Sequence, residues 1–318
     1  MKTDASASPA LIGLDWGTTS LRAYLMDGTG AVIGERAEPW GIMQLGDRDF
    51  ARASTDITAQ WTGVADVPVI ACGMVGSANG WMEVPYCAVP AGVSELGAAL
   101  RIVDGTLVHI VPGVLQRREA ADVMRGEETQ AIGVLALQAR LRDDSPMIFP
   151  GTHSKWVHVR NEHISSFNSY MTGELFAVLR DHSILGRLAD PSTPPSSHSA
   201  ASAFAFGVRA ARDSSRGTEA LLFSARARVL VGDMPADASL EYLSGVLIGG
   251  ELRSALADER KPTALVGERS LCARYVNALA AFGVTKVPVI DDAAPAGLWA
   301  IAVAAGLVRG SAVPGERQ

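Results

Sequence analysis

The sequence predicts an α/β protein built from two similar domains, and two observations carry that prediction. A strand, a Gly-Thr turn and two further strands occupy residues 10–36, and the same order returns at residues 147–167. Between and after these stretches, short apolar runs typical of buried strands alternate with helical stretches. Two copies of one strand-led unit in 318 residues indicate two domains whose Gly-Thr turns meet at a shared cleft.

Composition narrows the classes of function. Hydrophobic residues make up 48% of the chain and the net charge is −6, which indicates a large core and argues against broad nucleic-acid binding. The longest apolar run near the C-terminus, 298–308, is too short to cross a membrane. Cys72, Cys87 and Cys272 are widely spaced and odd in number, which is typical of free thiols in a reducing cytoplasm. The polar N-terminus has no signal-peptide apolar region, so we expect a cytoplasmic protein with no membrane partner.

The first Gly-Thr turn carries an acid at the end of its leading strand. The apolar run 10–14 stops at Asp15, a Trp-Gly-Thr-Thr turn follows, and residues 20–26 leave with alternating side chains. Backbone N–H groups of a glycine-containing turn can bind phosphate oxygens, and an adjacent carboxylate suits a hydrated magnesium ion. An ordinary hairpin, in which Asp15 and the threonines only bond the turn backbone, is the alternative that this stretch alone leaves open.

Common nucleotide-binding motifs are missing from the sequence. The Walker A motif requires a lysine after a glycine, and none of the four lysines (Lys2, Lys155, Lys261 and Lys286) follows one. No GxGxxG follows the first strand, and the chain has no HExxH and no GxSxG. A bound nucleotide therefore requires another architecture.

The next part of the chain completes the first sheet and adds a glycine-containing loop. Residues 31–36 predict a third antiparallel strand, 49–61 a helix and 68–72 a buried central strand. The loop 73–81 combines glycines with small polar groups at the C-terminal end of that strand, where open α/β sheets bind ligands. A plain connecting loop is the alternative.

An acidic cluster precedes a strong helix former at 131–142. Residues 94–103 predict a helix and 106–111 a strand before it. The cluster holds one arginine among three acids, Asp122, Arg125, Glu127 and Glu128. Acids at a helix start also complement the helix dipole, so a structural role stays open. The Pro-Gly loop before the cluster and the arginine within it favour a functional role.

The second Gly-Thr turn differs from the first in its charged residues. Residues 147–150 enter the turn 151–154, and 155–160 leave it as a strand. This turn lacks an acid and carries His153 and Lys155 instead. One turn would therefore favour the metal and the other the phosphate charge, while a turn-structure role for His153 and a solvated position for Lys155 are the alternatives.

The rest of the chain predicts mainly helices. We expect helices at 175–182, 200–213, 218–230, 236–257, 271–281 and 293–308, strands at 263–266 and 287–290, and an exposed Pro/Ser-rich loop at 191–199. The long helix 236–257 contains Gly245, Gly249 and Gly250. Each glycine inside a helix costs about 1 kcal/mol relative to alanine. Their presence indicates the close approach of a flat ligand or of a packed helix.

Six short blocks together make the chain similar to a known family. In order they are DWGTTSLRAYLMD, GMVGSANGW, DVMRGEETQ, PGTHSKWV, MTGE and LSGVLIGGE. Their order and spacing resemble the 2-dehydro-3-deoxygalactonokinase family of the sugar-kinase, hexokinase and actin superfamily. The resemblance implies two ribonuclease-H-like domains facing across a cleft: an N-terminal one at 1–144 with the sugar-acid site and a phosphate loop, and a C-terminal one at 145–318 that binds ATP.

The resemblance also implies the ligand-binding residues. Asp15 would hold Mg²⁺ through water. The nucleotide would contact the two phosphate loops and an adenosine turn, namely Gly17, Thr18, Thr19, Gly151, Thr152, His153, Gly249, Gly267 and Ser270. The sugar-acid site would take Gly73, Met74, Ser77 and Trp81 from the loop, with Arg125 and Lys155 as candidates for the substrate carboxylate.

The implied reaction transfers the γ-phosphoryl group of ATP to the 6-hydroxyl of 2-dehydro-3-deoxy-D-galactonate. Related sugar kinases place the catalytic base in a Gly-Asp pair before the second phosphate loop, and this chain has Gly126-Glu127 there, with Glu in place of Asp. Asp122 and Glu128 therefore compete with Glu127 for the role of base. The alternatives are a kinase for a related sugar acid or anhydro-sugar, or a non-metabolic ATPase of the same superfamily. Homodimer formation stays open.

Overall fold

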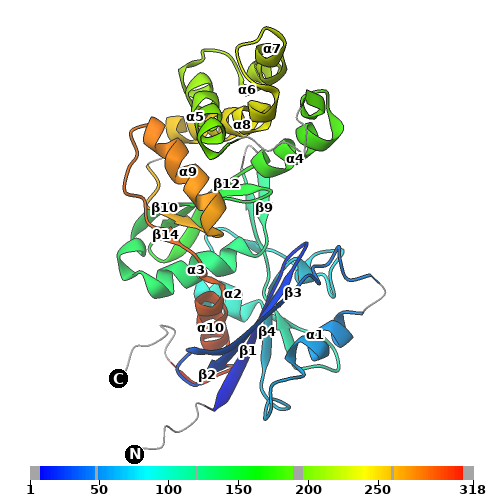
Figure 1. The fold of residues 1–318 in the computed structure, drawn as a ribbon. Helices are drawn as coiled ribbons and strands as arrows, with labels where there is room; N and C mark the ends of the chain where they lie inside the picture. Colours follow the sequence, from blue (N-terminus) through cyan, green and yellow to red (C-terminus); the bar gives the residue numbers. More distant parts are fainter. Residues whose placement is uncertain (1–7, 47–48, 119, 189–195, 259–260, 311–318) are drawn as a thin grey trace, which may run out of the picture. The chain divides into compact units, whose positions relative to one another are not determined.

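The structure is a computed structural model that describes residues 8–46, 49–118, 120–188, 196–258 and 261–310 (Figure 1). Contacts between Cα atoms group the chain into two compact units. Unit 1 comprises Met1–Ser145, Val157–Phe167 and Asp292–Gln318, and unit 2 comprises Pro146–Trp156 and Asn168–Asp291. The chain thus passes between the units more than once, and the single domain boundary after residue 144 stays a prediction.

The main sheet of unit 1 has six strands in the order β3-β2-β1-β4-β7-β6. In that order they are β3 (Val32–Glu38), β2 (Leu21–Asp27), β1 (Pro9–Trp16), β4 (Val69–Gly73), β7 (Val108–Ile110) and β6 (Arg101–Ile102). Strands β1 to β3 are antiparallel neighbours, whereas β4 is parallel to β1 and β7 is parallel to β4. Parallel strands end at the same edge of a sheet, so the ends of β1 and β4 lie together.

The core of unit 1 forms on the central strands. Strands β1 and β2 are buried over most of their length because their apolar runs leave few polar side chains to solvate. Their Leu14, Trp16 and Leu21 join one core cluster. Helix α1 (Phe50–Thr58) adds Ile57 to this cluster and starts at Asp49, whose side chain accepts a hydrogen bond from the Arg52 backbone N–H.

The remaining helices of unit 1 are α2 (Val93–Ala98), α3 (Glu127–Leu137) and α10 (Ala294–Ala304). Helices α3 and α10 approach closely through two glycines. A Cβ at Gly133 would lie 1.9 Å from the Ala293 carbonyl oxygen, and one at Gly297 would lie 1.9 Å from the Thr129 carbonyl oxygen. A small sheet consists of β5 (Cys87–Ala88), β8 (Val114–Arg117) and β9 (Ala121–Met124). Strand β9 precedes α3 in the chain, so α3 is positioned by this sheet at its start and by α10 along its length.

The second sheet repeats the strand order of the first. It runs β12-β11-β10-β13-β14, with β12 (His163–Tyr170), β11 (Ser154–Arg160), β10 (Asp144–Phe149), β13 (Ala264–Val266) and β14 (Val289–Ile290). β13 is parallel to β10 and β14 to β13. The two residues between β11 and β12, Asn161 and Glu162, have φ values of 49° and 63°, which a two-residue hairpin turn requires. The repeated order confirms the α/β, ribonuclease-H-like fold class predicted from the sequence.

The described part of unit 2 adds six α-helices to its part of this sheet, and α5 to α8 group together in Figure 1. They are α4 (Thr172–His182), α5 (Ser197–Asp213), α6 (Thr218–Leu222), α7 (Ser224–Leu230), α8 (Ser239–Asp258) and α9 (Arg269–Ala281). Helices α5 and α8 lie side by side in Figure 1. A Cβ at Gly245 would lie 2.2 Å from the Phe204 carbonyl oxygen, so glycine allows the two helices to touch.

Several predicted helices differ from the observed ones. The helix expected at 293–308, for example, ends at Ala304, and three others differ more. The helix expected at 94–103 ends at Ala98, because Arg101 pairs with Ile110 in strand β6. The helix expected at 131–142 begins earlier, at Glu127, and ends at Leu137. The helix expected at 218–230 is two helices, α6 and α7, that meet at Phe223. Most of the Pro/Ser-rich loop expected at 191–199 lies outside the described residues, and α5 already begins at Ser197.

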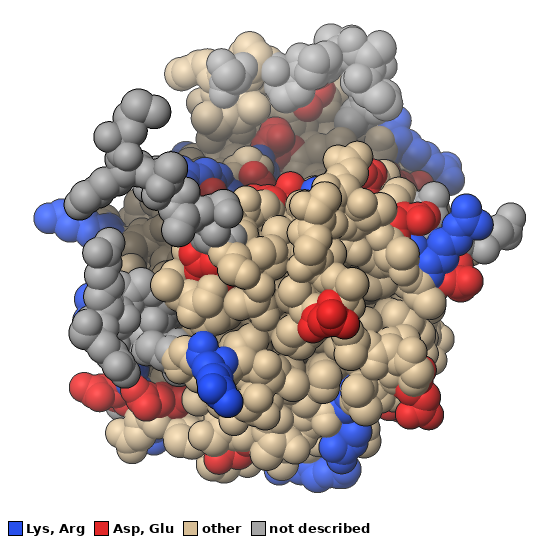
Figure 2. Space-filling view, turned by 90° about the horizontal axis from the view of Figure 1, so that it is seen from below, with Lys and Arg blue, Asp and Glu red and all other residues tan. Residues whose placement is uncertain are grey.

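The charged side chains are dispersed on the face shown in Figure 2. Lys and Arg alternate there with Asp and Glu among uncharged residues, so that face carries no broad region of one sign in its described part. Among the described helices, none combines the length and apolar character needed to span a bilayer.

Candidate active site

Asp15 lies near the C-terminal end of β1, half-buried between two neighbouring strands. Arg22 of β2 and Cys72 of β4 are its partners in the sheet register. The Cys72 thiol donates a weak hydrogen bond to Asp15 Oδ1 over 3.8 Å. Burial raises the pKa of Asp15 to about 6, and the nearby Arg22 offsets part of that rise. The carboxylate is thus only partly compensated within the protein, as a cation-binding group requires.

The first Gly-Thr turn is held in place by the segment 40–43. The carbonyl oxygens of Gly17 and Thr18 accept backbone hydrogen bonds from that segment, each 3.1 Å long. A Cβ at Gly41 would lie 2.2 Å from the Thr19 backbone nitrogen, so only glycine allows this approach. The side chains of Thr18 and Thr19 stay exposed. The turn is fixed through its carbonyl oxygens while its threonines face solvent.

Glu127 is a second carboxylate that the structure places near Asp15. It begins α3 directly after Gly126, whose φ of 110° is a conformation that glycine adopts readily. A Cβ at Gly126 would lie 3.5 Å from Gly73 Cα, so the start of α3 approaches the end of β4. The charge of Glu127 also contributes to the raised pKa of Asp15. The end of β1, the end of β4 and the start of α3 therefore form one polar cluster in unit 1.

The two competing acids occupy different surroundings. Glu128 is 0% exposed, and its oxygens accept hydrogen bonds from the Gly126 N–H at 2.6 Å and the Thr129 hydroxyl at 2.9 Å. Burial raises the pKa of Glu128 to about 7, and the neighbouring charge of Glu127 adds to the rise. Asp122 is half-buried on β9 and accepts a hydrogen bond from the next backbone N–H at 2.8 Å. Glu128 is thus engaged in its own helix turn, whereas Glu127 is partly exposed.

Asp292 joins the cluster and was missed by sequence reasoning. The Tyr24 hydroxyl donates to its Oδ2 at 2.9 Å, and the Ala294 N–H donates to its Oδ1 at 3.2 Å. The charge of Asp292 also raises the pKa of Asp15. The Asp-Asp pair before an Ala-Pro helix start was a visible capping signal, but nothing in the sequence connected it with Asp15 on the first strand.

Arg125 lies against the loop that follows β4. Its Nη2 donates to the Val84 carbonyl oxygen at 2.8 Å, and its Cζ lies 4.4 Å from the centre of the Tyr86 ring. A Cβ at Gly76 would lie 2.7 Å from Nη1. Nε and Nη1 are buried and have no hydrogen-bond partner among the residues that the structure describes. A buried guanidinium with two unused donors is a group that an anion would satisfy.

Gly73, Met74, Ser77 and Trp81, also expected at the sugar acid, lie on this same loop. Gly73 has a φ of 88° and would place a Cβ 2.7 Å from the Trp16 carbonyl oxygen, so it packs beside the end of β1. Ser77 donates from Oγ to the Met74 carbonyl oxygen at 2.7 Å and closes a short 3₁₀ turn. Trp81 stacks on Phe50 at 6.2 Å and contacts the Trp16 ring edge-on. The loop is ordered by contacts with the unit 1 core.

The second Gly-Thr turn, in unit 2, is covered by the start of α4. The Glu174 N–H donates to the Thr152 carbonyl oxygen at 2.9 Å, and the Glu174 side chain pairs with His153 Nε2. A Cβ at Gly173 would lie 2.5 Å from the Gly151 carbonyl oxygen. This turn is therefore also fixed through its carbonyl oxygens, by a helix that carries glycine at the point of contact.

Lys155 follows the second turn and is only 5% exposed. Its Nζ donates to the His153 carbonyl oxygen over 3.4 Å. The solvated position that the sequence left open for Lys155 is therefore wrong. Its contact with a substrate or a phosphate stays a prediction.

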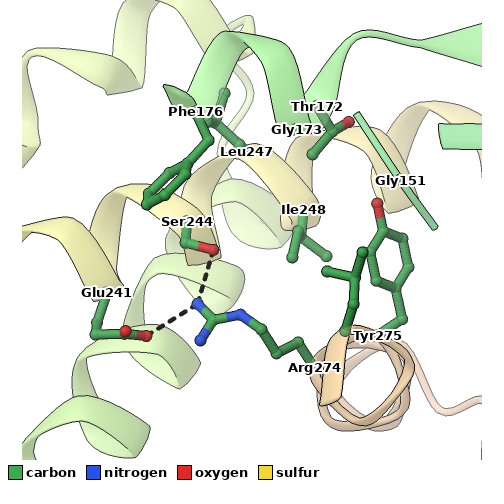
Figure 3. A pocket seen from close by; sticks show the side chains of 11 residues that line it. Gly151, Thr172, Gly173, Phe176, Glu241, Ser244, Leu247, Ile248, Arg274 and Tyr275 are labelled. Carbon is green, nitrogen blue, oxygen red and sulfur yellow. Dashed lines mark hydrogen bonds and ion pairs between the residues drawn. The ribbon is translucent and has the colours of Figure 1, made fainter. Parts of the chain in front are cut away.

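A cavity of about 260 Å³ opens beside the second turn (Figure 3). Its lining is mainly apolar, with one arginine and one glutamate: Gly151, Thr172, Gly173, Phe176, Glu241, Ser244, Leu247, Ile248, Leu271, Arg274 and Tyr275. Figure 3 shows Arg274 turned toward Glu241 and Ser244, to which Nη2 donates at 2.9 Å and 2.7 Å. A largely apolar cavity with a few fixed polar groups is typical of a small-molecule binding site.

The predicted adenosine turn lies close to the second Gly-Thr turn. Gly267 has a φ of 131°, and its Cβ would lie 3.8 Å from the carbonyl oxygen of Pro150, the residue before Gly151. Ser270 lies in the first turn of α9, where its N–H and hydroxyl donate to Glu268. The next residue, Leu271, lines the cavity.

Gly249 has a different environment from the rest of the adenosine residues. Its Cβ would lie 2.9 Å from Ala211 Cβ and from the Val208 carbonyl oxygen, both on α5. Gly250 faces Thr218 of α6 in the same way, at 2.2 Å. Of the two explanations that the sequence left open for these glycines, the structure shows the packed helix.

Glu251, a buried acid of unit 2 with four side-chain donors, was missed by sequence reasoning as a functional candidate. It is 4% exposed on α8 and accepts hydrogen bonds from four side chains, Ser154, Trp156, Thr172 and Tyr275. Burial raises the pKa of Glu251. Its position in the block LSGVLIGGE was visible, but its partners were not.

A magnesium ion fits Asp15 only as a hydrated ion. Within the described part of the chain, no three His, Cys, Asp or Glu side chains converge on a metal position. Magnesium, however, keeps several waters and takes one or two carboxylates together with substrate phosphates. Asp15, half-buried beside a turn that can bind phosphate, meets that requirement.

Two sheets of one strand order, each with a Gly-Thr turn after its first strand, define a class: α/β proteins with the ribonuclease-H-like fold that the sequence predicted. Within this class the chain belongs to the 2-keto-3-deoxy-galactonokinase family, whose sequence model matches residues 15–301. The family predicted from the sequence is confirmed.

Individual relatives match almost the whole chain. A 2-dehydro-3-deoxygalactonokinase of Escherichia coli (strain K12) is 38% identical over 299 residues, which cover 92% of this chain and 97% of that protein. A solved structure from Sinorhizobium meliloti, provisionally named a 2-dehydro-3-deoxygalactonokinase, superposes with a TM-score of 0.84 at 34% identity. It covers 92% of this chain and 98% of its own. The chain therefore matches nearly the full length of both relatives.

Proposed function

We propose that the protein transfers the γ-phosphoryl group of ATP to the 6-hydroxyl of 2-dehydro-3-deoxy-D-galactonate, a step of D-galactonate catabolism. The observation that carries the proposal is the cluster of Asp15, Glu127 and the first Gly-Thr turn, in a chain that belongs to a kinase family. Phosphoryl transfer requires positioning and charge stabilisation, and these groups supply both. The three free cysteines and the soluble ligands support a cytoplasmic site of action.

In unit 1, each residue has a separate role in the proposed reaction. Asp15 holds hydrated Mg²⁺, which neutralises phosphate charge when bound. The backbone N–H groups of Thr18 and Thr19 bind phosphate oxygens, because the carbonyl side of the turn is already engaged. Glu127 accepts the proton of the attacking hydroxyl, since it is partly exposed and belongs to the same cluster. Glu128 lacks that exposure and caps the helix instead.

In unit 2, the cavity beside Gly151 binds the adenosine part of the nucleotide. Phe176, Leu247 and Ile248 offer apolar surface to the base, and Gly151 to His153 lie beside the cavity as the phosphate-binding turn. Gly267 and Ser270 border the same region through Leu271. The cavity volume of about 260 Å³ is at the small end for a ligand site, which suits a nucleoside better than a larger cofactor.

For the sugar acid, Arg125 and Lys155 are the candidates for binding the carboxylate. Within the described part of the chain, two buried nitrogen atoms of Arg125 have no hydrogen-bond partner, and a carboxylate would supply one. Its position against Gly76 ties it to the loop expected to contact the sugar. Lys155 is a buried ammonium whose hydrogen bond is to a neutral carbonyl oxygen.

A substrate panel tests the proposal. Purified full-length protein with ATP and Mg²⁺ should release ADP in the presence of 2-dehydro-3-deoxy-D-galactonate, and the product should carry phosphorus coupled to the C6 protons in NMR. The gluconate epimer and an anhydro-sugar acid serve as comparison substrates. Faster turnover of either would shift the assignment to the related-acid kinase. ADP release that no acid stimulates would favour the non-metabolic ATPase.

A metal series tests the cofactors separately. Removing divalent ions with EDTA should abolish ADP release, and MgCl₂ should restore it. Full activity in EDTA would contradict the role of Asp15. Replacing ATP with GTP at equal concentration tests whether the cavity prefers adenine.

A further inference from the structure

Glu251 is a buried acid whose whole hydrogen-bonding capacity is directed at the second Gly-Thr turn and its surroundings. Its Oε1 accepts from Ser154 Oγ at 2.8 Å and from Trp156 Nε1 at 2.9 Å. Its Oε2 accepts from Tyr275 Oη at 2.7 Å and from the Thr172 hydroxyl. All four donors are neutral. A carboxylate buried among neutral donors is costly unless every donor is well placed, so its surroundings have to be held in one arrangement.

The four donors come from the elements that surround the turn. Ser154 is the first residue of β11, directly after the turn, and Thr172 is the first residue of α4, which covers the turn. Tyr275 lies on α9. Thr172 and Tyr275 line the cavity, and so does Gly151 of the turn itself. One carboxylate thus connects the strand that leaves the turn with the helix above it and with the cavity wall.

The start of α4 transmits this arrangement to the turn backbone. Gly173 touches the Gly151 carbonyl oxygen, since a Cβ there would lie only 2.5 Å away. The Glu174 N–H donates to the Thr152 carbonyl oxygen at 2.9 Å. The position of Thr172 therefore sets the positions of Gly173 and Glu174, which contact the backbone of the turn. Ser154 fixes the other end of the same turn.

We propose that Glu251 is a positioning residue for the nucleotide phosphates: it sets the backbone of the 151–153 turn relative to the cavity. The inference rests on the proposed use of ATP. Because Glu251 is buried behind the turn, it acts through Ser154 and Thr172 and does not touch the ligand. Its loss should weaken the binding of phosphates much more than the binding of the nucleoside in the cavity, whose wall includes Thr172 and Tyr275.

Two substitutions distinguish the length of the Glu251 side chain from its charge: one keeps the length and removes the charge, and the other does the reverse. In Glu251→Gln, the amide oxygen can accept from Ser154 and Trp156, while its NH₂ donates to the hydroxyls of Thr172 and Tyr275, which rotate to accept. Glu251→Asp keeps the charge but is one methylene shorter, so it cannot reach all four donors. The dissociation constants of ATP and adenosine are measured for both variants by calorimetry.

We expect E251Q to bind ATP within about threefold of the wild type, because its hydrogen bonds are retained. E251D should bind ATP about tenfold more weakly, the effect of one or two lost hydrogen bonds, while its adenosine affinity changes less than twofold. A purely structural role would change both ligands together or neither. Either of those results, or a loss of ATP affinity in E251Q with E251D unaffected, would overturn the proposal.

A second pair keeps the test decisive if E251D does not fold. Ser154→Ala and Trp156→Phe each remove one hydrogen bond to the same Oε1, and neither residue lines the cavity. Only Ser154 adjoins the turn. S154A should weaken ATP about fivefold and spare adenosine, whereas W156F should leave the ratio of the two affinities unchanged. Equal ratios in S154A and W156F would contradict the positioning role.

The outcome is distinguishable from failure of the proposed function. If the wild-type protein binds ATP and the variants behave as described but no sugar acid is phosphorylated, only the substrate assignment fails. If the wild-type protein binds adenosine and ATP equally, the turn adds nothing for phosphates and the role of Glu251 is overturned. Binding of neither ligand would overturn the nucleotide site and this inference together.

Discussion

The two Gly-Thr turns share a backbone scaffold and differ in the acid that accompanies them. Each follows the first strand of a sheet with the same order, and each is covered by a segment with glycine at the contact, Gly41 over the first and Gly173 over the second. Asp15 belongs to the first turn's own strand and is half-buried. Glu251 reaches the second turn from α8, 97 positions from Ser154, and is buried. The two turns thus share a strand order and a covering glycine, whereas the acids beside them come from different elements.

The exposure of the two acids explains what each can do. Among the described residues, the hydrogen-bond donor to the Asp15 carboxylate is a weak one, the Cys72 thiol at 3.8 Å, so the carboxylate stays available to an ion. Glu251 has all its lone pairs directed at hydroxyl and indole donors and is available to nothing else. Asp15 is therefore suited to contact a ligand, whereas Glu251 is suited to hold the turn in place. Substitutions that remove charge and keep shape should separate the two.

The largest effect is expected for Glu127→Gln, beside the first turn. Removing a general base lowers the rate by typically 10²–10⁴-fold, so kcat should fall by that factor while the affinity for ATP is retained. Steady-state kinetics with the sugar acid and calorimetry with ATP provide the two measurements. A kcat near the wild-type value would transfer the role of base to Asp122 or Glu128.

Asp15→Asn should have the next largest effect. An amide cannot match the charge of a carboxylate toward Mg²⁺, so kcat should fall about 10²–10³-fold and the Mg²⁺ concentration for half-maximal rate should rise. E251Q is the matched change at the second turn and should alter neither quantity by more than about threefold. Equal losses in D15N and E251Q would break the distinction between the two turns.

The features that were predictable from the sequence are local. Strand periodicity and the repeated Gly-Thr pair predicted both turns, and the acid before the first turn indicated Asp15 because it is adjacent in the chain. The partners of Glu251 lie on β11, α4 and α9, so they exist only after the helices pack. The burial of Glu128 likewise depends on where α3 begins. Contacts between segments that are far apart in the chain produce no periodicity or residue spacing in the sequence from which they could be predicted.

Gly249 illustrates the same limit. A glycine in a helix indicates that something approaches closely, and the sequence cannot say whether it is a ligand or a helix. The structure resolves this, because Val208 and Ala211 of α5 occupy the space beside it. The sequence thus located the close approach at Gly249 correctly but did not identify what approaches.

Glu128→Gln tests the buried acid of the unit 1 cluster through the pH dependence of stability. Burial raises the pKa of Glu128 to about 7 from its ordinary 4.5, so the folded protein binds more protons than the unfolded chain between these values. Stability should therefore fall as pH rises through this window and stay reduced above it. At pH 8 the variant should be more stable by up to about 3 kcal/mol, and the gain should shrink as pH approaches 4.5.

Urea unfolding of wild type and E128Q from pH 4.5 to 8 measures this effect. Glu83→Gln, a change at an exposed acid, is the control and should shift stability by less than about 0.5 kcal/mol at any pH. A gain in E128Q that is the same at every pH would show that ionisation of Glu128 is not its cause.

The smallest effects are expected at the two covering glycines, and they test whether the turns share one scaffold. In Gly41→Ala the new Cβ would lie 2.2 Å from the Thr19 backbone nitrogen, and in Gly173→Ala it would lie 2.5 Å from the Gly151 carbonyl oxygen. Backbone atoms cannot yield as a flexible side chain can, so each variant should lose about 1–3 kcal/mol of stability. Gly28→Ala is the control, since nothing lies within 4 Å of its Cβ. Urea unfolding compares the three, and a stability of G41A or G173A equal to that of G28A would show that the covering segment does not fix its turn.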